Sequence, residues 1–194
     1  MSPDAPFPQV LSAAAEGAEW AWARLYRTHA PHLLRFLASQ GARDPEDLLA
    51  EVFIQIVRKL HTFTGEEGDF RAWAFRIARR RLIDAWRAEQ RRPATTQEAT
   101  DASHHSWHAP PADRDIDQRT AVEDILATLT VDQRAVLVLR HVHQFSVDET
   151  AAILDKTPGA VRVLQHRAVR SLRRTLATPT GWAAMAPEPG LAQA

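Results

Sequence analysis

Apolar residues recur every three or four positions along much of this chain, the spacing of a helix with one buried face. Residues 16–40 show this spacing first, although Pro31 lies inside the run and is expected to bend or divide the helix. Residues 1–15 are rich in Pro and Ala and are predicted to be disordered. No strand signal of comparable strength appears, so the chain is predicted to be all-α.

Two further helices follow. Asp44-Pro45 combines an N-cap residue with proline at the first helical position, which predicts a helix to about His61. After a loop at 62–68, Asp69 is expected to cap a helix that Pro93 ends. The predicted buried faces of the two helices are Leu48, Val52, Phe53, Ile56 and Leu60, and then Phe70, Trp73, Ala74, Ile77, Leu82 and Trp86. The alternative role for the two tryptophans is stacking on DNA bases. Trp73 is in helical phase with Phe70 and Ile77, which favours a core position, while the role of Trp86 is undecided.

Residues 94–119 have no apolar periodicity and are rich in Thr, Ala, His, Asp and Pro. This composition predicts a flexible acidic linker between two small helical domains, at 16–93 and 120–176. In the second domain, Thr130 is expected to cap a helix through Val142. Residues 177–194 are predicted to form a disordered tail.

Residues 146–176 predict a helix-turn-helix. Ser146 and Glu149 form a capping-box pattern, and Thr157-Pro158 begins a second helix after a turn of a few residues. The inward positions of the second helix are Val161, Leu164, Ala168 and Leu172, which leaves its arginines largely outside. A solvated basic surface is the simpler explanation of one such helix, but the capped two-helix pattern favours DNA binding.

Charge is distributed unevenly within a chain of zero formal net charge, with 24 Lys and Arg against 24 Asp and Glu in 194 residues. Residues 71–92 hold eight arginines against two acids, and residues 160–176 hold five arginines and no acid. Phosphates respond to such local fields rather than to the average. The zero net charge therefore does not exclude nucleic-acid binding, because the two basic blocks could bind phosphates.

Other observations exclude several classes of protein. The chain has no cysteine, which excludes disulfides and thiolate metal sites and fits a reducing cytoplasm. No apolar run reaches the ~20 residues of a membrane span, and the start does not resemble a secretory signal. His104, His105 and His108 lie in the linker without a rigid frame for a metal. We therefore predict a cytoplasmic protein that is not an enzyme and has no catalytic residue, metal or cofactor.

Three ordered motifs resemble a known family. Asp44-Pro45-Glu46-Asp47-Leu48-Leu49-Ala50-Glu51-Val52-Phe53 and the Arg-rich run from Phe70 to Asp84 look like region two of bacterial sigma factors. The run from Leu129 to Leu137 and the helix-turn-helix resemble region four. Two such domains and a linker match the extracytoplasmic-function (ECF) subfamily of the sigma-70 class. The resemblance implies a region-two three-helix bundle and a region-four helix-turn-helix.

The resemblance also implies partners and site residues. Sigma factors bind core RNA polymerase and promoter DNA, and an anti-sigma factor typically restrains this subfamily. Four residues match the core polymerase surface: Asp47, Leu48, Glu51 and Val52. Those assigned to the minus-10 element are Arg71, Arg76, Arg79, Arg80, Trp86 and Arg87. Those assigned to the minus-35 element are Lys156, Thr157, Arg162, Gln165, His166, Arg167 and Arg170.

Three positions depart from the family pattern. Ala50 stands where the family usually has Gln, and Arg80 stands where Asn is common. Asp155-Lys156 replaces the usual Gly-apolar turn, although Asp tolerates a left-handed backbone better than most residues. A simple core role is the alternative for Leu48 and Val52. A stand-alone helix-turn-helix regulator is the rival function, and it would bind duplex DNA without polymerase.

Overall fold

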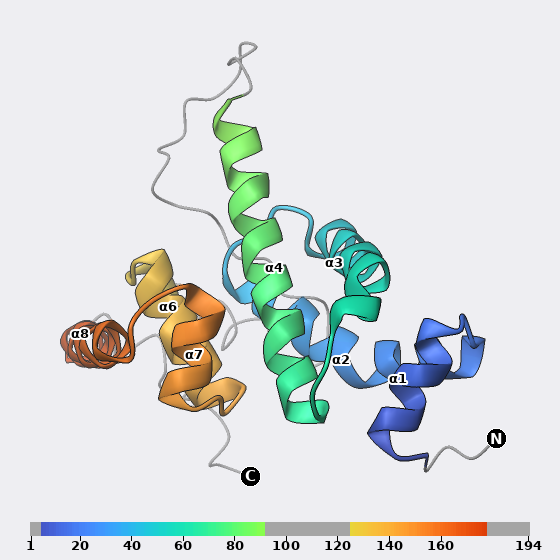
Figure 1. Cartoon of the computed structure of the whole chain (residues 1–194). Coiled ribbons are helices and arrows are strands. Elements are labelled where there is room, and N and C mark those ends of the chain that lie inside the picture. Colours follow the sequence, from blue (N-terminus) through green and yellow to red (C-terminus); the bar gives the residue numbers. More distant parts are fainter. Residues whose placement is uncertain (1–4, 92–124, 178–194) are drawn as a thin grey trace, which may run out of the picture.

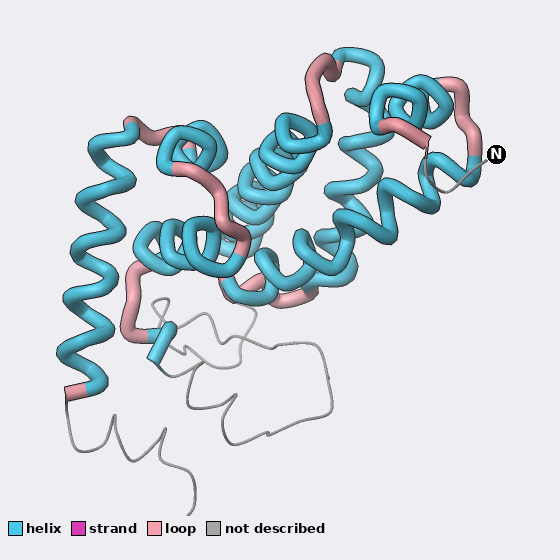
Figure 2. The backbone as a smooth tube through the Cα atoms, turned by 90° about the horizontal axis from the view of Figure 1, so that it is seen from below, coloured by secondary structure: helices cyan, strands magenta, loops and turns pink. Residues whose placement is uncertain are grey.

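The computed structural model describes residues 5–91 and 125–177, and the described part of the chain contains helices and no strands (Figures 1 and 2). The prediction of an all-α fold is confirmed for these residues. The predicted linker at 94–119 and the tail beyond residue 177 lie outside them. In chain order the elements are α1 (Phe7–Ala15), α2 (Glu19–Ser39), α3 (Pro45–Lys59), the short 3₁₀ helix η1 (Leu60–Thr62), α4 (Glu67–Gln90), α6 (Val131–Leu137), the π-helical segment η2 (Val138–Val142), α7 (Val147–Leu154) and α8 (Pro158–Leu176).

Helices α2, α3 and α4 pack together as the first half of the molecule. The predicted buried face of α3 is confirmed, since Val52 and Ile56 have no exposed surface and Leu48, Phe53 and Leu60 are also buried. Pro31 neither divides nor ends α2, which runs unbroken across it. Proline removes only one backbone donor, and the buried Leu33 and Phe36 that follow hold the helix in the core.

The N-terminal prediction is wrong for Phe7–Ala15, which forms helix α1 rather than a disordered segment. Its apolar face is buried, and the Phe7 ring lies edge-on against Phe70 with centroids 5.6 Å apart. Trp22 Nε1 donates a hydrogen bond of 2.9 Å to the Ala14 carbonyl. Tertiary contacts therefore stabilise a short helix that would be marginal alone.

Side-chain caps begin three of the helices as predicted, whereas Asp44 is the N-cap residue of α3 without a capping hydrogen bond from its side chain. Thr130 accepts from the Gln133 backbone N–H, Ser146 from that of Glu149, and Thr157 from that of Ala160. The start of α4 differs, because Glu66 rather than Asp69 is its N-cap residue. Asp69 Oδ2 instead reaches back to accept a hydrogen bond of 3.0 Å from the Glu66 N–H, which is the second half of a capping box.

The helix-turn-helix of α7 and α8 turns at Asp155, which has left-handed backbone angles of φ 54° and ψ 51°. The Lys156 N–H donates to the Ala151 carbonyl and closes the end of α7. Asp155 therefore occupies the position for which glycine is the usual residue, as its tolerance of this conformation predicts. Val161 and Ala168, on the inward side of α8, are fully buried.

The two halves share one core. Helix α4 stands between α3 on one side and α7 on the other (Figure 1). Phe75 of α4 and Phe145, just before α7, are each 1% exposed, and their rings meet with centroids 4.9 Å apart. A single cluster of buried apolar residues runs from α1 to α8. The sequence does not predict this contact between the halves.

Candidate nucleic-acid and polymerase surfaces

The first candidate surface lies at the start of α3. Asp47 and Glu51 are exposed beside a hollow of about 240 Å³, which Leu48 also lines together with residues from the end of α4. Val52 has no exposed surface and offers none to a partner. Val52 is therefore a core residue, which was the alternative to a polymerase contact. Leu48 is also buried, but it lines the hollow.

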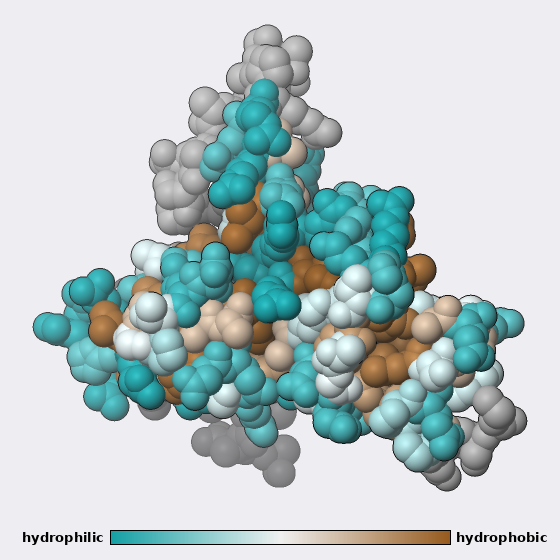
Figure 3. All heavy atoms as spheres, in the orientation of Figure 1, coloured by the Kyte–Doolittle hydropathy of each residue, from teal (hydrophilic) through white to brown (hydrophobic). Residues whose placement is uncertain are grey.

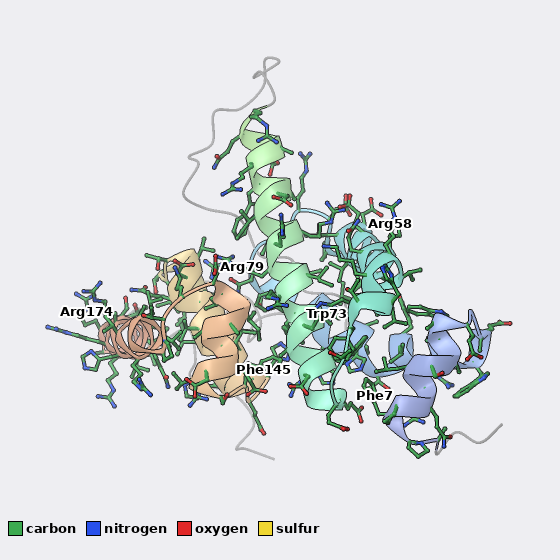
Figure 4. The ribbon with its side chains drawn as sticks, in the orientation of Figure 1. Phe7, Arg58, Trp73, Arg79, Phe145 and Arg174 are labelled. Atoms are coloured by element: carbon green, nitrogen blue, oxygen red, sulfur yellow. The ribbon has the colours of Figure 1, made fainter. Side chains whose placement is uncertain are left out.

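Sequence reasoning missed an apolar part of the same helix. Ile54 and Val57 are 49% and 52% exposed, and Arg58 points away from the fold (Figure 4). Asp47, Glu51, Ile54 and Arg58 follow one another at helical spacing, so they form one stripe along α3. The signal that could have found Ile54 is this phase: an apolar residue in register with two exposed acids.

Aromatic side chains surround the loop before α4. Phe63 lies 5.1 Å from Trp73 and 5.4 Å from Phe70, measured between ring centroids. Phe70 is fully buried, whereas Trp73 is half-buried and also lines a hollow of about 630 Å³ with Phe63 and Arg76. Trp73 thus packs against the core as predicted and still borders an open space. Asp148 and Glu149 of α7 also line that hollow.

The arginines of α4 fall into two groups. Arg76, Arg80 and Arg87 are exposed. Arg79 is only 8% exposed, and its NH2 group lies 3.0 Å from Asp132 Oδ1 of α6. Arg71 is half-buried, with its guanidinium 4.3 Å from the centre of the Phe145 ring and donating to the His143 carbonyl. Two of the five arginines predicted to bind minus-10 DNA therefore contact the second half of the molecule.

Burial lowers the pKa values of two side chains at the contact between the two halves, Arg79 and His143. The Arg79 guanidinium also lies 5.5 Å from the centre of the half-buried Trp86 ring. Burial lowers the pKa of Arg79, and the Asp132 carboxylate opposes that change. His143 is 1% exposed among the Phe36 and Phe75 rings. Burial lowers its pKa to about 4, with the nearby positive charges acting in the same direction. The junction therefore holds a neutral imidazole close to the half-buried guanidinium of Arg71.

Helix α8 carries the second basic surface. Arg162, His166, Arg167, Arg170, Arg173 and Arg174 are exposed along it, and Arg174 extends away from the fold at the outer side of α8 (Figure 4). Gln165 is half-buried, with Nε2 3.3 Å from His141 Nε2. Lys156 Nζ forms an ion pair of 2.8 Å with Asp132 Oδ2, and the Thr157 hydroxyl caps α8. Figure 3 shows hydrophilic residues gathered over α8 and the upper part of α4.

The described residues contain neither a metal centre nor a membrane span. Within residues 5–91 and 125–177, no group of three or more His, Asp or Glu side chains is placed to hold a metal ion. The three linker histidines lie outside these ranges. Of the helices in the described part of the chain, none has the length and apolar character needed to cross a bilayer.

Known proteins resemble both halves. The sigma-70 region 2 model matches residues 25–92, and the sigma-70 region 4 model matches residues 119–172. The ECF RNA polymerase sigma factor BldN of Streptomyces coelicolor is 32% identical, over 90% of this chain and 67% of its own length. The ECF RNA polymerase sigma factor SigX of Bacillus subtilis is 33% identical, over 77% of this chain and 80% of its own length.

Solved structures agree on the fold. CnrH, in complex with the cytosolic domain of CnrY, matches 87% of this chain and 95% of its own with a TM-score of 0.61 and 25% identity. RpoE from Bartonella quintana, in complex with the anti-sigma factor NepR, matches 79% of this chain and 94% of its own with a TM-score of 0.59 and 22% identity. Both family models occur here in the order that the motifs predict. The chain belongs to the sigma-70 family as an ECF RNA polymerase sigma factor, which binds core RNA polymerase and directs promoter-specific initiation of transcription.

Proposed function

We propose that α8 reads the minus-35 element by lying in the major groove of promoter DNA. The observation that carries this proposal is the arrangement of α8: apolar residues anchor one side while arginines are exposed on the other. Recognition helices place the residues of their first turns near base edges. Arg162, Gln165 and His166 are therefore assigned to bases, and Lys156, Thr157, Arg167 and Arg170 to phosphates.

The surface around the loop before α4 is assigned to the opened minus-10 strand. Arg76, Arg80 and Arg87 are exposed and can follow phosphates, while Phe63 and Trp73 border a hollow in which an unstacked base could lie. Arg71, Arg79 and Trp86 are assigned to the same strand. The arginine at position 80 replaces the family's common Asn, so base preference there is expected to differ from that of most relatives.

The exposed stripe of α3 is assigned to core RNA polymerase. It sets the acids Asp47 and Glu51 beside the apolar Ile54, a combination that suits an interface with a small apolar centre and a polar rim. Ala50 lies between these residues and contributes no polar group. Leu48 and Val52 support the stripe from within. The polymerase supplies the nucleotidyl-transfer chemistry, so this chain acts in the cytoplasm as a specificity subunit without catalysis of its own.

An anti-sigma factor is the proposed regulator. The Bartonella relative was solved in complex with an anti-sigma factor, and CnrH with the cytosolic domain of CnrY. A partner of this kind would inhibit transcription by covering the α3 stripe or the DNA-reading helices. The two domains at 16–93 and 120–176 would then serve both as promoter readers and as the target of inhibition.

Transcription with core polymerase tests the assignment of α8. After the bound promoters have been mapped, Arg162→Ala should weaken use of the cognate minus-35 element by about 1–3 kcal/mol and relax the preference at one base pair. The matched control is Arg174→Ala, which removes an exposed arginine from the far end of the same helix. Equal losses on all minus-35 sequences would reassign Arg162 to phosphate. Tight sequence-specific duplex binding without polymerase would instead favour a stand-alone regulator.

A further inference from the structure

A cluster of aromatic rings connects α1 to the loop before α4, which lies far from α1 in the sequence. The Phe7 ring of α1 points toward the start of α4 and packs against Phe70, with centroids 5.6 Å apart (Figure 4). Phe70 also contacts Phe63 at 5.4 Å and Trp73 at 5.6 Å, and Phe63 and Trp73 border the hollow described above. The fully buried Phe70 therefore links Phe7 to both of these rings. We call these four side chains the aromatic cluster.

Hydrogen bonds hold both ends of α1 against α2. Arg24 NH1 donates a hydrogen bond of 2.5 Å to the Ala5 carbonyl, just before α1 begins. Trp22 Nε1 donates to the Ala14 carbonyl near the other end of the helix. Both donors belong to α2, which itself packs into the core. Helix α1 therefore has a fixed position, from which Phe7 can hold the ring of Phe70.

The backbone of the loop is set by its own neighbours, whereas its rings depend on the aromatic cluster. The Phe63 N–H donates a hydrogen bond of 2.9 Å to the Leu60 carbonyl, and the Glu66 N–H donates to Asp69 Oδ2 at 3.0 Å. These bonds fix the chain at the two ends of the loop. The side chains of Phe63 and Trp73 are only half-buried, and they pack on each other with centroids 5.1 Å apart. Their orientation therefore depends on the rings behind them.

An aromatic surface binds a base most tightly when its rings are already in place. Stacking on aromatic side chains is a common way for proteins to hold single-stranded bases. A ring that must first be immobilised reduces the affinity, and a ring that is held in advance avoids this cost. We propose that α1 is a positioning element for base capture: Phe7, acting through Phe70, holds Phe63 and Trp73 in the arrangement that accepts an unstacked base. This inference rests on the proposed assignment of the surface to the minus-10 strand.

Capture of a single strand by the complete chain bound to core polymerase tests the role of Phe7. The probe is the non-template minus-10 strand of a mapped promoter, with a fluorescent adenine analogue placed at each position in turn. The parent chain should change the fluorescence at the captured base. Phe7→Ala should weaken strand binding about tenfold and reduce that change, because the rings are no longer held. Affinity for core polymerase and the salt dependence of strand binding should stay the same, because the α3 stripe and the arginines are unaltered.

Two further variants separate positioning from a loss of stability. Val10→Ala removes part of a fully buried side chain from the same helix, but Val10 carries no ring. It should lower the free energy of unfolding and leave strand capture unchanged. Phe7→Leu keeps apolar volume at the buried position without the ring, so it should fold like the parent chain and still weaken capture by about threefold. Strand capture by Phe7→Leu therefore decides the question even if Phe7→Ala does not fold.

A double-mutant cycle tests the path through the aromatic cluster. Trp73→Ala removes one of the rings that Phe7 is proposed to hold, so adding Phe7→Ala to it should weaken capture by only about twofold further. Additive losses, or equal capture by the parent chain and Phe7→Leu, overturn the positioning role of α1. A different result overturns the assignment of the surface itself: the parent chain changes the fluorescence at no position, and Trp73→Ala binds the strand as the parent does.

Discussion

Helices α4 and α8 are both rich in arginine, yet the fold uses their arginines differently. On α8 the five arginines are exposed, and buried apolar residues anchor the opposite side of the helix. On α4, Arg76, Arg80 and Arg87 are exposed, while Arg71 and Arg79 turn toward the second half of the molecule. The difference arises from position, because α4 is packed on two sides and α8 lies at the edge (Figure 1). An arginine-rich sequence therefore indicates a basic helix without telling which arginines a ligand can reach.

The largest effect on stability is expected at the aromatic contact between the two halves. Phe145→Ala should lower the free energy of unfolding by about 3–5 kcal/mol, because Phe145 is 1% exposed and packs against Phe75 and Arg71. Urea denaturation followed by circular dichroism measures the loss. Val163→Ala is the matched control on α8, where the side chain is 49% exposed, and it should cost little. A small loss for Phe145→Ala would mean that α4 is not packed on its second side.

The second largest effect is expected from acid, which should lower the free energy of unfolding. Burial lowers the pKa of His143 and of His29 from 6.5 to about 4. The unfolded chain therefore takes up protons that the folded chain rejects as the pH falls from 6.5 toward 4. These two groups leave stability intact above pH 7 and reduce it in that window, by on the order of 2 kcal/mol each at pH 5.

Urea denaturation at pH 8 and pH 5 measures this dependence. His143→Gln removes one of the two titrating groups, so it should reduce the difference in stability between the two pH values. His61→Gln is the matched control because His61 is exposed on η1. Should His143→Gln and the parent chain lose equal stability on acidification, the buried imidazole at the junction is not the group that responds.

The smallest effect on stability is expected at the start of α8. Thr157→Ala removes the hydroxyl that accepts a hydrogen bond of 3.2 Å from the Ala160 N–H, and should cost about 1 kcal/mol. Thr157→Ser retains the cap and should be close to neutral. Differential scanning calorimetry gives both values. An equal loss in the two variants would indicate that the Thr157 methyl group, rather than the hydroxyl, stabilises the helix start.

Local signals in the sequence predicted much of the fold. The caps at Thr130, Ser146 and Thr157 occur where the pattern placed them, because a cap depends on side chains within three residues of one another. The buried face of α3 is also as predicted. Helix α1 was missed, since its stability comes from contacts such as Phe7 with Phe70, which lie far apart in the sequence.

The candidate sites divide in the same way. Sequence motifs identified both basic helices and the acidic start of α3, and helical phase correctly left the α8 arginines exposed. Helical phase could not show that Arg79 forms an ion pair while Arg80 stays exposed. The partner of Arg79 is the Asp132 carboxylate, which lies 53 residues further along the chain. Val52 likewise looks like part of a polymerase motif and proves to be fully buried.

By itself the sequence determined the type, order and ends of most helices, and through its motifs the family to which the chain belongs. These properties depend on neighbours along the chain and on the period of a helix. Only the tertiary structure decided that α4 contacts α7, that His143 is buried and neutral, and that Asp132 pairs with cations from both halves. The physical reason is that such contacts join residues far apart in sequence, whose approach depends on how complete helices pack.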